Sequence, residues 1–215
     1  QGRLFWTYLT GPGTNGGVNV VSQQVNPTTG ALIGGRSFVA QGNLDKEWIA
    51  AGTNGKVTVT WTRFSLGPKG AGYRSSEIVS ANSKDYGKTW NNQGSPVSDA
   101  AHPFNQGSQV QYGSDGALYV SYEATSPVFG YTTDAMVIAR STDGGSTYQT
   151  KELARVYDDL DCYPTFAGRQ TLTDMHFRLN SYPSMSVDPV TGEISLAWTD
   201  EQNVGTCGTA AASFT

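Results

Sequence analysis

The sequence predicts an all-β chain built from repeated four-stranded antiparallel sheets. Short runs in which apolar and polar residues alternate recur along the 215 residues, and helical periodicity is nearly absent. The clearest runs lie at 57–63, 118–123 and 194–199, and each follows a tight turn that carries a glycine. The aromatic residue of each run lies six positions after that glycine, which indicates that the same β-hairpin occurs three times in the chain.

A second repeated unit lies between these hairpins. Residues 83–90 and 141–148 share the pattern Ser-x-Asp-x-Gly-x-Thr-aromatic, and each follows a short apolar strand. The carboxylate can accept backbone N–H groups, the glycine supplies an unusual backbone angle, and the aromatic residue packs under the next strand. The pattern therefore predicts a self-contained turn. Its structural residues are Ser83, Asp85, Gly87 and Trp90 in one copy and Ser141, Asp143, Gly145 and Tyr148 in the other.

Hairpin, third strand, carboxylate turn and fourth strand follow one another in a repeat of about 40–60 residues, which is the signature of a β-propeller. We expect one propeller region over 1–215, with blades at roughly 1–42, 43–101, 102–156 and 180–215. The first blade begins at its second strand and the last stops at its third, so the ring is incomplete, at about three and a half blades. Because such a ring leaves sheet edges exposed, we expect a further chain segment or self-association to complete it.

The two carboxylate turns resemble the Asp boxes of the sialidase-like β-propeller family, also called the BNR-repeat family. The resemblance rests on 83–90 and 141–148, at corresponding places in consecutive blades, and the blade pattern covers essentially the whole chain. It implies a secreted, glycan-directed protein. One form of this hypothesis is an exo-glycosidase that releases terminal sugars, and the alternative is a non-catalytic glycan-binding, adhesion or structural extracellular propeller.

The composition excludes several other classes of protein. The chain has 18 acidic and 14 basic residues, a net charge of −4 and no run of Lys or Arg, so nucleic acid is not an expected partner. No apolar stretch approaches the ~20 residues that span a bilayer. Apolar residues make up 37% of the chain and are spread throughout, which argues against disorder. The family resemblance, rather than the composition, implies a carbohydrate ligand as the partner.

One mouth of a propeller is surrounded by the connections between strands two and three and between successive blades, whereas Asp boxes lie on the opposite face. The mouth-side segments are 42–47, 63–76, 99–106, 123–135, 157–182 and 199–208. Their candidate glycan-binding residues are Asp45, Glu47, Arg63, Arg74, Glu123, Arg169 and Arg178. Tyrosines that can stack on sugar rings are Tyr73, Tyr131, Tyr163 and Tyr182. His102 precedes Pro103 and is interpreted as a turn residue.

The family resemblance implies three kinds of catalytic group. Arginines would bind a substrate carboxylate through forked hydrogen bonds, and the candidates are Arg63, Arg74, Arg169 and Arg178. A tyrosine activated by Glu123 or Glu201 would be the nucleophile, and Asp45 would be the acid and base. The family's N-terminal Arg-Ile-Pro motif is absent, so no catalytic residue can be assigned by motif.

Cys162 and Cys207 both lie in polar surroundings without further metal-ligating residues nearby. We expect them to form a disulfide, as in secreted proteins, with two free thiols as the alternative. No metal site or cofactor is predicted. The carboxylates of Asp158, Asp159 and Asp161 can contribute to a structural calcium site, with a solvated acidic loop as the alternative.

Overall fold

The computed structural model describes residues 3–12, 17–68, 72–91, 94–130, 133–157 and 180–200. These residues form thirteen strands and no α-helix. The disulfide predicted between Cys162 and Cys207, and the acidic group at Asp158, Asp159 and Asp161, lie outside the described residues. Among the described residues, no helix is long and apolar enough to cross a membrane.

The strands form four antiparallel sheets, each in simple sequence order. The first sheet contains β1 (Leu4–Thr10), β2 (Val18–Val25) and β3 (Leu32–Gly42). The second contains β4 (Leu44–Ala51), β5 (Val57–Leu66), β6 (Tyr73–Ser83) and the short β7 (Ser95–Pro96). The third contains β8 (Asn105–Tyr112), β9 (Leu118–Thr125), β10 (Asp134–Ser141) and β11 (Gln149–Val156). The fourth contains β12 (Ser184–Val187) and β13 (Ile194–Ala197).

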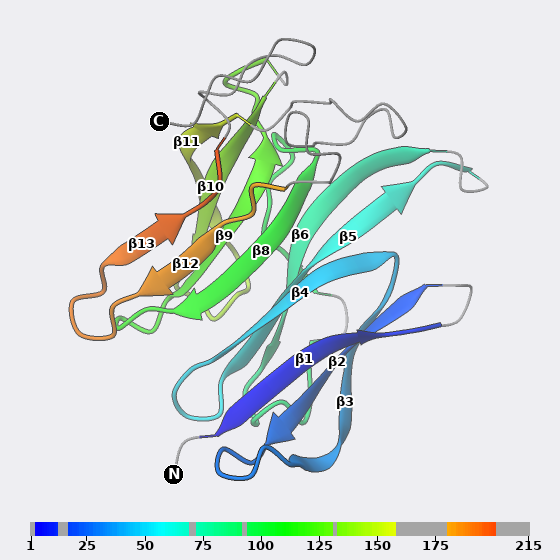
Figure 1. The fold of residues 1–215 in the computed structure, drawn as a ribbon, viewed down its shortest axis with the longest axis vertical. Helices are drawn as coiled ribbons and strands as arrows, with labels where there is room; N and C mark the ends of the chain where they lie inside the picture. The colour runs from blue at the N-terminus through cyan, green and yellow to red at the C-terminus, as the bar shows by residue number, and fades with distance from the viewer. Residues whose placement is uncertain are drawn as a thin grey trace, which may run out of the picture.

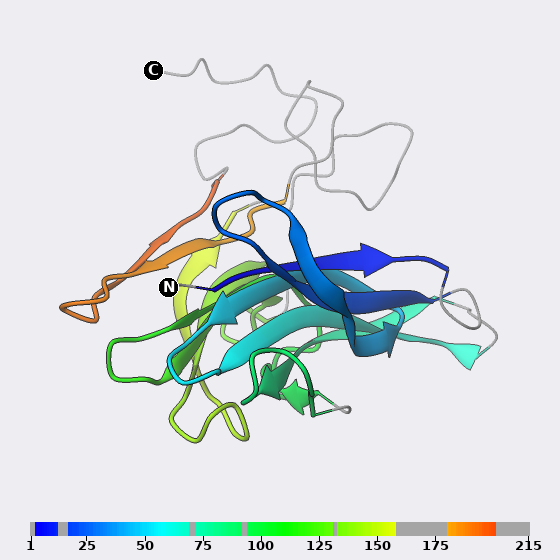
Figure 2. The same cartoon turned by 90° about the horizontal axis from the view of Figure 1, so that it is seen from below.

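Successive sheets pack face to face, and their innermost strands lie side by side (Figures 1 and 2). In Figure 1 the arrows of β4, β8 and β12 all point the same way, as the first strands of propeller blades do. The arrow of β1 points the opposite way in both views, so β1 has the direction of a second strand. The fold is therefore an all-β propeller with four-stranded antiparallel blades and an incomplete ring, as predicted. The exact blade boundaries stay a prediction.

We call the end of the molecule at which β4, β8 and β12 begin the mouth face, and the end with the Asp boxes the turn face.

The side chains of β5 alternate between two interfaces with neighbouring sheets, which we call seams. Val57, Val59 and Trp61 are buried against the first sheet in one apolar cluster. Thr58 and Thr60 point the other way and meet hydroxyls of the third sheet, with Thr60 accepting a hydrogen bond from Ser108 at 3.1 Å. The seam to the first sheet is thus apolar, whereas the seam to the third includes polar pairs.

The first Asp box is closed by its own side chains. Asp85 Oδ1 accepts the backbone N–H groups of Lys88 and Thr89 at 3.0 and 2.9 Å, and Oδ2 accepts the Thr89 hydroxyl at 2.7 Å. Ser83 donates its hydroxyl to Asp85 at 2.7 Å and accepts the N–H of Gly87 at 2.9 Å. These bonds lower the pKa of Asp85 to about 2, those from Thr89 most of all.

The second Asp box repeats this arrangement. Asp143 accepts from Ser146 N and Thr147 N at 3.0 Å each and from the Thr147 hydroxyl at 2.6 Å. Hydrogen bonds from Thr147, and then from Ser141, hold the pKa of Asp143 well below its ordinary value. Both aspartates lie on the turn face, at the opposite end of the sheets from the mouth face, which fits a structural role.

The aromatic residue of each box reaches back to the preceding sheet. Trp90 donates its indole N–H to the Ser37 hydroxyl on β3 at 2.8 Å. Tyr148 shares a hydrogen bond of 3.0 Å with the Ser80 hydroxyl on β6. Burial raises the pKa of Tyr148 to about 12. Each Asp box therefore joins its own sheet to the one before it, in addition to closing a turn.

The two boxes predict a loss of stability in acid. Because the pKa of each carboxylate is lower in the folded chain, its contribution is complete above the unfolded value of about 4 and is lost as the pH falls through the folded value. We expect the free energy of unfolding to fall between about pH 4 and pH 2, and to fall less steeply in Asp85→Asn combined with Asp143→Asn. Urea unfolding at several pH values measures these slopes. Thr89→Val, which removes one donor to Asp85, is expected to give an intermediate slope, and equal slopes in all three proteins would contradict the prediction.

One face of the first sheet is apolar and exposed. Trp6 on β1 and Phe38 on β3 are 55% and 56% exposed, and Leu4 is 51% exposed. On the opposite side of the same strands, Phe5 and Val39 pack into the seam with the second sheet. The exposed side thus has the composition of a face that another sheet covers.

Candidate functional site

The mouth face carries a β-bulge at the start of β4. Pairing with β5 is irregular between Asp45 and Trp48, and Lys46 adopts a positive φ of 56°. The Asp45 carboxylate accepts the Lys46 backbone N–H at 2.9 Å and lies 3.1 Å from the Lys46 ammonium. The bulge re-aims these side chains away from the regular alternation of the strand.

The third sheet begins with the same irregularity. Pairing of β8 with β9 shifts between Gln106 and Gln109, and Gly107 has a φ of 66°. The Tyr182 ring lies directly on Gly107, where an added Cβ would overlap the ring. Tyr182 donates its hydroxyl to Gln106 Oε1, and the Lys46 ammonium lies 5.7 Å from the centre of its ring. Residues of the second and third sheets therefore meet the segment that leads into the fourth sheet here.

A row of aromatic rings continues from this point. The Tyr73 ring lies 5.6 Å from that of Phe64 and 5.3 Å from that of Phe104, centre to centre. Tyr73 donates its hydroxyl to Ser76 Oγ at 2.7 Å. Burial raises the pKa of Tyr73, and hydrogen bonds with Ser76 and Gln106 oppose this shift. Gln106, which accepts the Tyr182 hydroxyl, thus also lies near Tyr73. We call Asp45, Lys46, Glu47, Tyr73, Gln106 and Tyr182 the mouth strip.

Glu47 has a shifted pKa within the mouth strip. Burial is the largest cause and raises the pKa, and the Asp45 carboxylate acts in the same direction. A backbone hydrogen bond and the charge of Lys46 oppose the shift. A carboxyl group with a raised pKa can keep its proton to higher pH, which is what a general acid requires.

Glu123 lies deeper, beside the mouth strip. It is 5% exposed and is the direct cross-strand partner of Gln106 on β9. Cross-strand partners lie on the same face of a sheet, so Glu123 and Tyr182 are both neighbours of Gln106. A tyrosine activated by Glu123 stays a prediction.

The structure does not show the four predicted arginines as one cluster among the described residues. Arg63 on β5 makes two hydrogen bonds to Glu77 Oε2 across the strand pair, at 2.6 and 3.2 Å, so its guanidinium already has a carboxylate partner in this chain. Arg74 is exposed at the start of β6, next to Tyr73. Arg169 and Arg178 lie outside the described residues, as do Tyr131 and Tyr163. An arginine cluster for a substrate carboxylate therefore stays a prediction.

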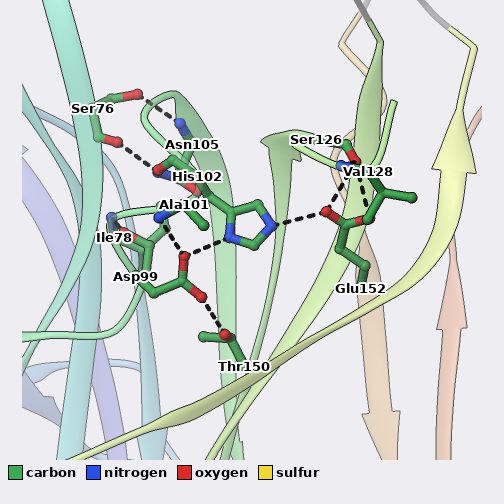
Figure 3. Close-up of polar contacts among 11 residues, drawn as sticks. Ser76, Ile78, Asp99, Ala101, His102, Asn105, Ser126, Val128, Thr150 and Glu152 are labelled. Carbon is green, nitrogen blue, oxygen red and sulfur yellow. Dashed lines mark hydrogen bonds and ion pairs between the residues drawn. The ribbon is translucent and has the colours of Figure 1, made fainter. Parts of the chain in front are cut away.

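His102 ends a turn, as expected, with its N–H donating to the Asp99 carbonyl at 3.3 Å, and its side chain is buried at the centre of a polar network between the second and third sheets (Figure 3). Its Nδ1 lies 2.7 Å from Asp99 Oδ1 and its Nε2 lies 3.1 Å from Glu152 Oε1 on β11. Glu152 also accepts the Ser126 hydroxyl at 2.9 Å, and Thr150 donates to Asp99 Oδ2. With both ring nitrogens directed at carboxylates, this network holds the connection between two sheets.

The described part of the chain contains no group of three or more His, Cys, Asp or Glu side chains that could hold a metal ion. The mouth strip itself carries carboxyl, ammonium, amide and phenol groups. Lys46 and Gln106 are the strip residues absent from the candidates taken from the sequence.

Comparisons with known proteins bear on the fold. No family model and no curated protein matches the chain. Among solved structures, the Hadza microbial sialidase Hz136 is similar with a TM-score of 0.54 and 11% identity, over 87% of this chain and 37% of that one. A protein of unknown function from Dyadobacter fermentans DSM 18053 has a TM-score of 0.43 and 21% identity, over 70% and 45%. An exo-1,5-α-L-arabinanase from a bovine ruminal metagenomic library has a TM-score of 0.42 and 13% identity, over 69% and 56%.

The chain thus spans between 37% and 56% of the length of these three proteins. At these identities the likeness concerns the fold. Together with the sheet order and strand directions, the likeness to the sialidase places the chain among the β-propellers built from four-stranded antiparallel blades.

Proposed function

We propose that the protein binds carbohydrate through the mouth strip. The observation that carries this proposal is that Lys46 and Gln106 both contact Tyr182, with Tyr73 beside them, so that residues of β4, β6, β8 and the segment before β12 come together. Aromatic rings offer flat apolar surfaces to the C–H faces of sugars, while the amide, ammonium and carboxylate groups offer hydrogen bonds to sugar hydroxyls. The Asp boxes and the likeness to a sialidase structure support the same class of ligand by analogy of fold.

Lys46→Ala tests the proposal, and Lys56→Ala is its control. The two variants remove the same charge, but Lys56 is an exposed residue in the turn between β4 and β5, on the turn face. Alanine at position 46 adds no new backbone strain, because lysine already adopts the positive φ there. On a glycan array followed by calorimetry, we expect Lys46→Ala to weaken binding about tenfold and Lys56→Ala to leave it within about twofold. Native protein that binds no glycan would refute the proposal.

A second candidate function is exo-glycosidase activity. The raised pKa of Glu47 favours it, as does the position of Glu123 and Tyr182 on either side of Gln106. Incubation of the same glycans with native protein and Glu47→Gln separates the two functions. A glycosidase would release terminal sugars, and the variant would bind without releasing them. Binding without release by the native protein would leave a non-catalytic propeller.

Extracellular location and completion of the ring belong to the same proposal. The exposed apolar face at Trp6 and Phe38 supports its covering by a further sheet of the same propeller. The molar mass of the secreted protein in light scattering tests this point, because a monodisperse 22.9 kDa monomer would contradict both a longer chain and self-association.

A further inference from the structure

A hollow of about 370 Å³ opens on the mouth face, in the seam between the first and second sheets. Its walls come from the start of β2, the connection from β3 to β4, the end of β5 and the start of β6. The side chains that shape it are those of Val18, Leu44, Phe64, Leu66 and Tyr73. We call it the side hollow. It is shallow and open to solvent on most sides, and its volume falls near the lower end of the range for small-molecule sites, about 300–1,000 Å³.

The lining of the side hollow is apolar and held open by the backbone. Leu66 and Tyr73 remain 45% and 48% exposed, although they line a concave surface. At the floor, a Cβ on Gly17 would come within 2.8 Å of the Gly42 carbonyl oxygen, so only glycine permits this close approach of two strands. The Asn43 carbonyl already accepts the Phe64 N–H at 2.8 Å. Among the residues that the structure describes, the lining therefore presents mainly C–H groups and rings beside Asn43, and none of its side chains is charged.

Tyr73 belongs to both the side hollow and the mouth strip. Its hydroxyl is bonded to Ser76, and its ring is packed between those of Phe64 and Phe104, so its orientation is fixed before any ligand arrives. A ligand held at Lys46, Gln106 and Tyr182 can thus continue across the Tyr73 ring into the hollow. Preorganised surfaces of this kind bind at low entropic cost.

We propose that the side hollow is a second sugar subsite, which takes the apolar face of a sugar unit linked to the one bound at the mouth strip. The ligand is then an oligosaccharide of at least two units. This inference rests on the proposed function. An alkyl group attached to a single sugar would also be apolar. A second sugar unit fits this surface better, because its C–H face can lie on the aromatic rings while its hydroxyls face the polar mouth strip.

The test compares matched pairs of ligands: glucose with maltose, galactose with lactose, and N-acetylneuraminic acid with its α-2,3-linked lactoside. For the pair that binds, we expect native protein to bind the longer sugar about tenfold more tightly than the monosaccharide. Leu66→Asn is expected to reduce this ratio to about one. The control is Leu153→Asn on β11, which changes a leucine of equal exposure, 44%, outside both regions and keeps the ratio at about ten.

Each outcome has a distinct meaning. A ratio near one in native protein, or a ratio of ten retained in Leu66→Asn, overturns the second subsite while the proposed function stands. If the octyl glycoside of the bound monosaccharide binds as tightly as the longer sugar, and loses this gain in Leu66→Asn, the hollow is an alkyl site and the assignment to sugar is wrong. Lys46→Ala should weaken both members of a pair equally. Absence of binding by native protein to every sugar overturns the proposed function and the subsite together.

Discussion

His102→Ala is expected to lower the free energy of unfolding by about 3 kcal/mol, the largest loss from any single side-chain truncation that we predict. The imidazole is 6% exposed and lies within hydrogen-bond distance of both Asp99 and Glu152. Its removal leaves two carboxylates facing an empty space between the second and third sheets. The Asp99 side chain is 40% exposed and regains some water, so the loss should lie at the low end of the range for broken buried pairs.

Urea unfolding at neutral pH measures this loss as a lower midpoint at constant slope. Thr150→Val removes only the hydroxyl that donates to Asp99 and is expected to cost about 1 kcal/mol, so it reports on the same network if His102→Ala fails to fold. Arg63→Ala breaks an exposed pair with Glu77 and should cost less than about 1 kcal/mol. A His102→Ala protein as stable as Arg63→Ala would show that the network contributes little.

The fold could be predicted because its signals are local. The hairpin turns need residues with positive φ, and Asn54, Gly55, Gly116 and Gly192 all adopt it in the structure. The Asp boxes close with hydrogen bonds no more than four residues apart in the sequence. Strand alternation and turn chemistry therefore determine the sheets without knowledge of distant contacts.

The environment of His102 could not be predicted in this way. The residues that surround it, Thr150 and Glu152, are about fifty positions further along the chain and lie on the outer strand of another sheet. Nothing in the residues next to His102 indicates that the fold will bury it. Long-range polar networks of this kind require the three-dimensional arrangement of the sheets.

Part of the candidate site was, in contrast, present in the sequence repeat. Asp45, Gln106 and Tyr182 each lie ten residues before the glycine of a hairpin turn, at positions 55, 116 and 192. They are therefore equivalent residues of successive blades, and the structure brings their side chains to one face. The candidates were chosen by charge, which selected Asp45 but missed the uncharged Gln106. The bulges at Lys46 and Gly107 also share a repeat position, nine residues before the turn glycine.

The second large effect is expected at Gly145 in the second Asp box. Gly144 and Gly145 have φ values of 77° and 85°, so alanine at either position is strained, at a cost of about 1–2 kcal/mol. The surroundings of the two residues differ. A Cβ on Gly144 meets nothing within 4 Å, whereas a Cβ on Gly145 would overlap the Asn82 side-chain amide of the second sheet, with Oδ1 at 2.7 Å and Cγ at 2.8 Å.

Asn82 cannot move away without loss. Its Oδ1 accepts the Thr58 hydroxyl at 2.7 Å within the second sheet, and its Nδ2 donates to the Gly145 carbonyl at 3.4 Å, so displacement of the amide breaks one bond within the second sheet and one to the Asp box of the third. We therefore expect Gly145→Ala to lower the free energy of unfolding by about 3 kcal/mol and Gly144→Ala by about 1–2 kcal/mol, as measured by urea unfolding. The combined variant Gly145→Ala with Asn82→Ala should recover part of the difference, because the overlap is removed. Equal losses at 144 and 145 would show that backbone strain alone sets the cost, and that the Asp box does not depend on its close approach to the neighbouring sheet.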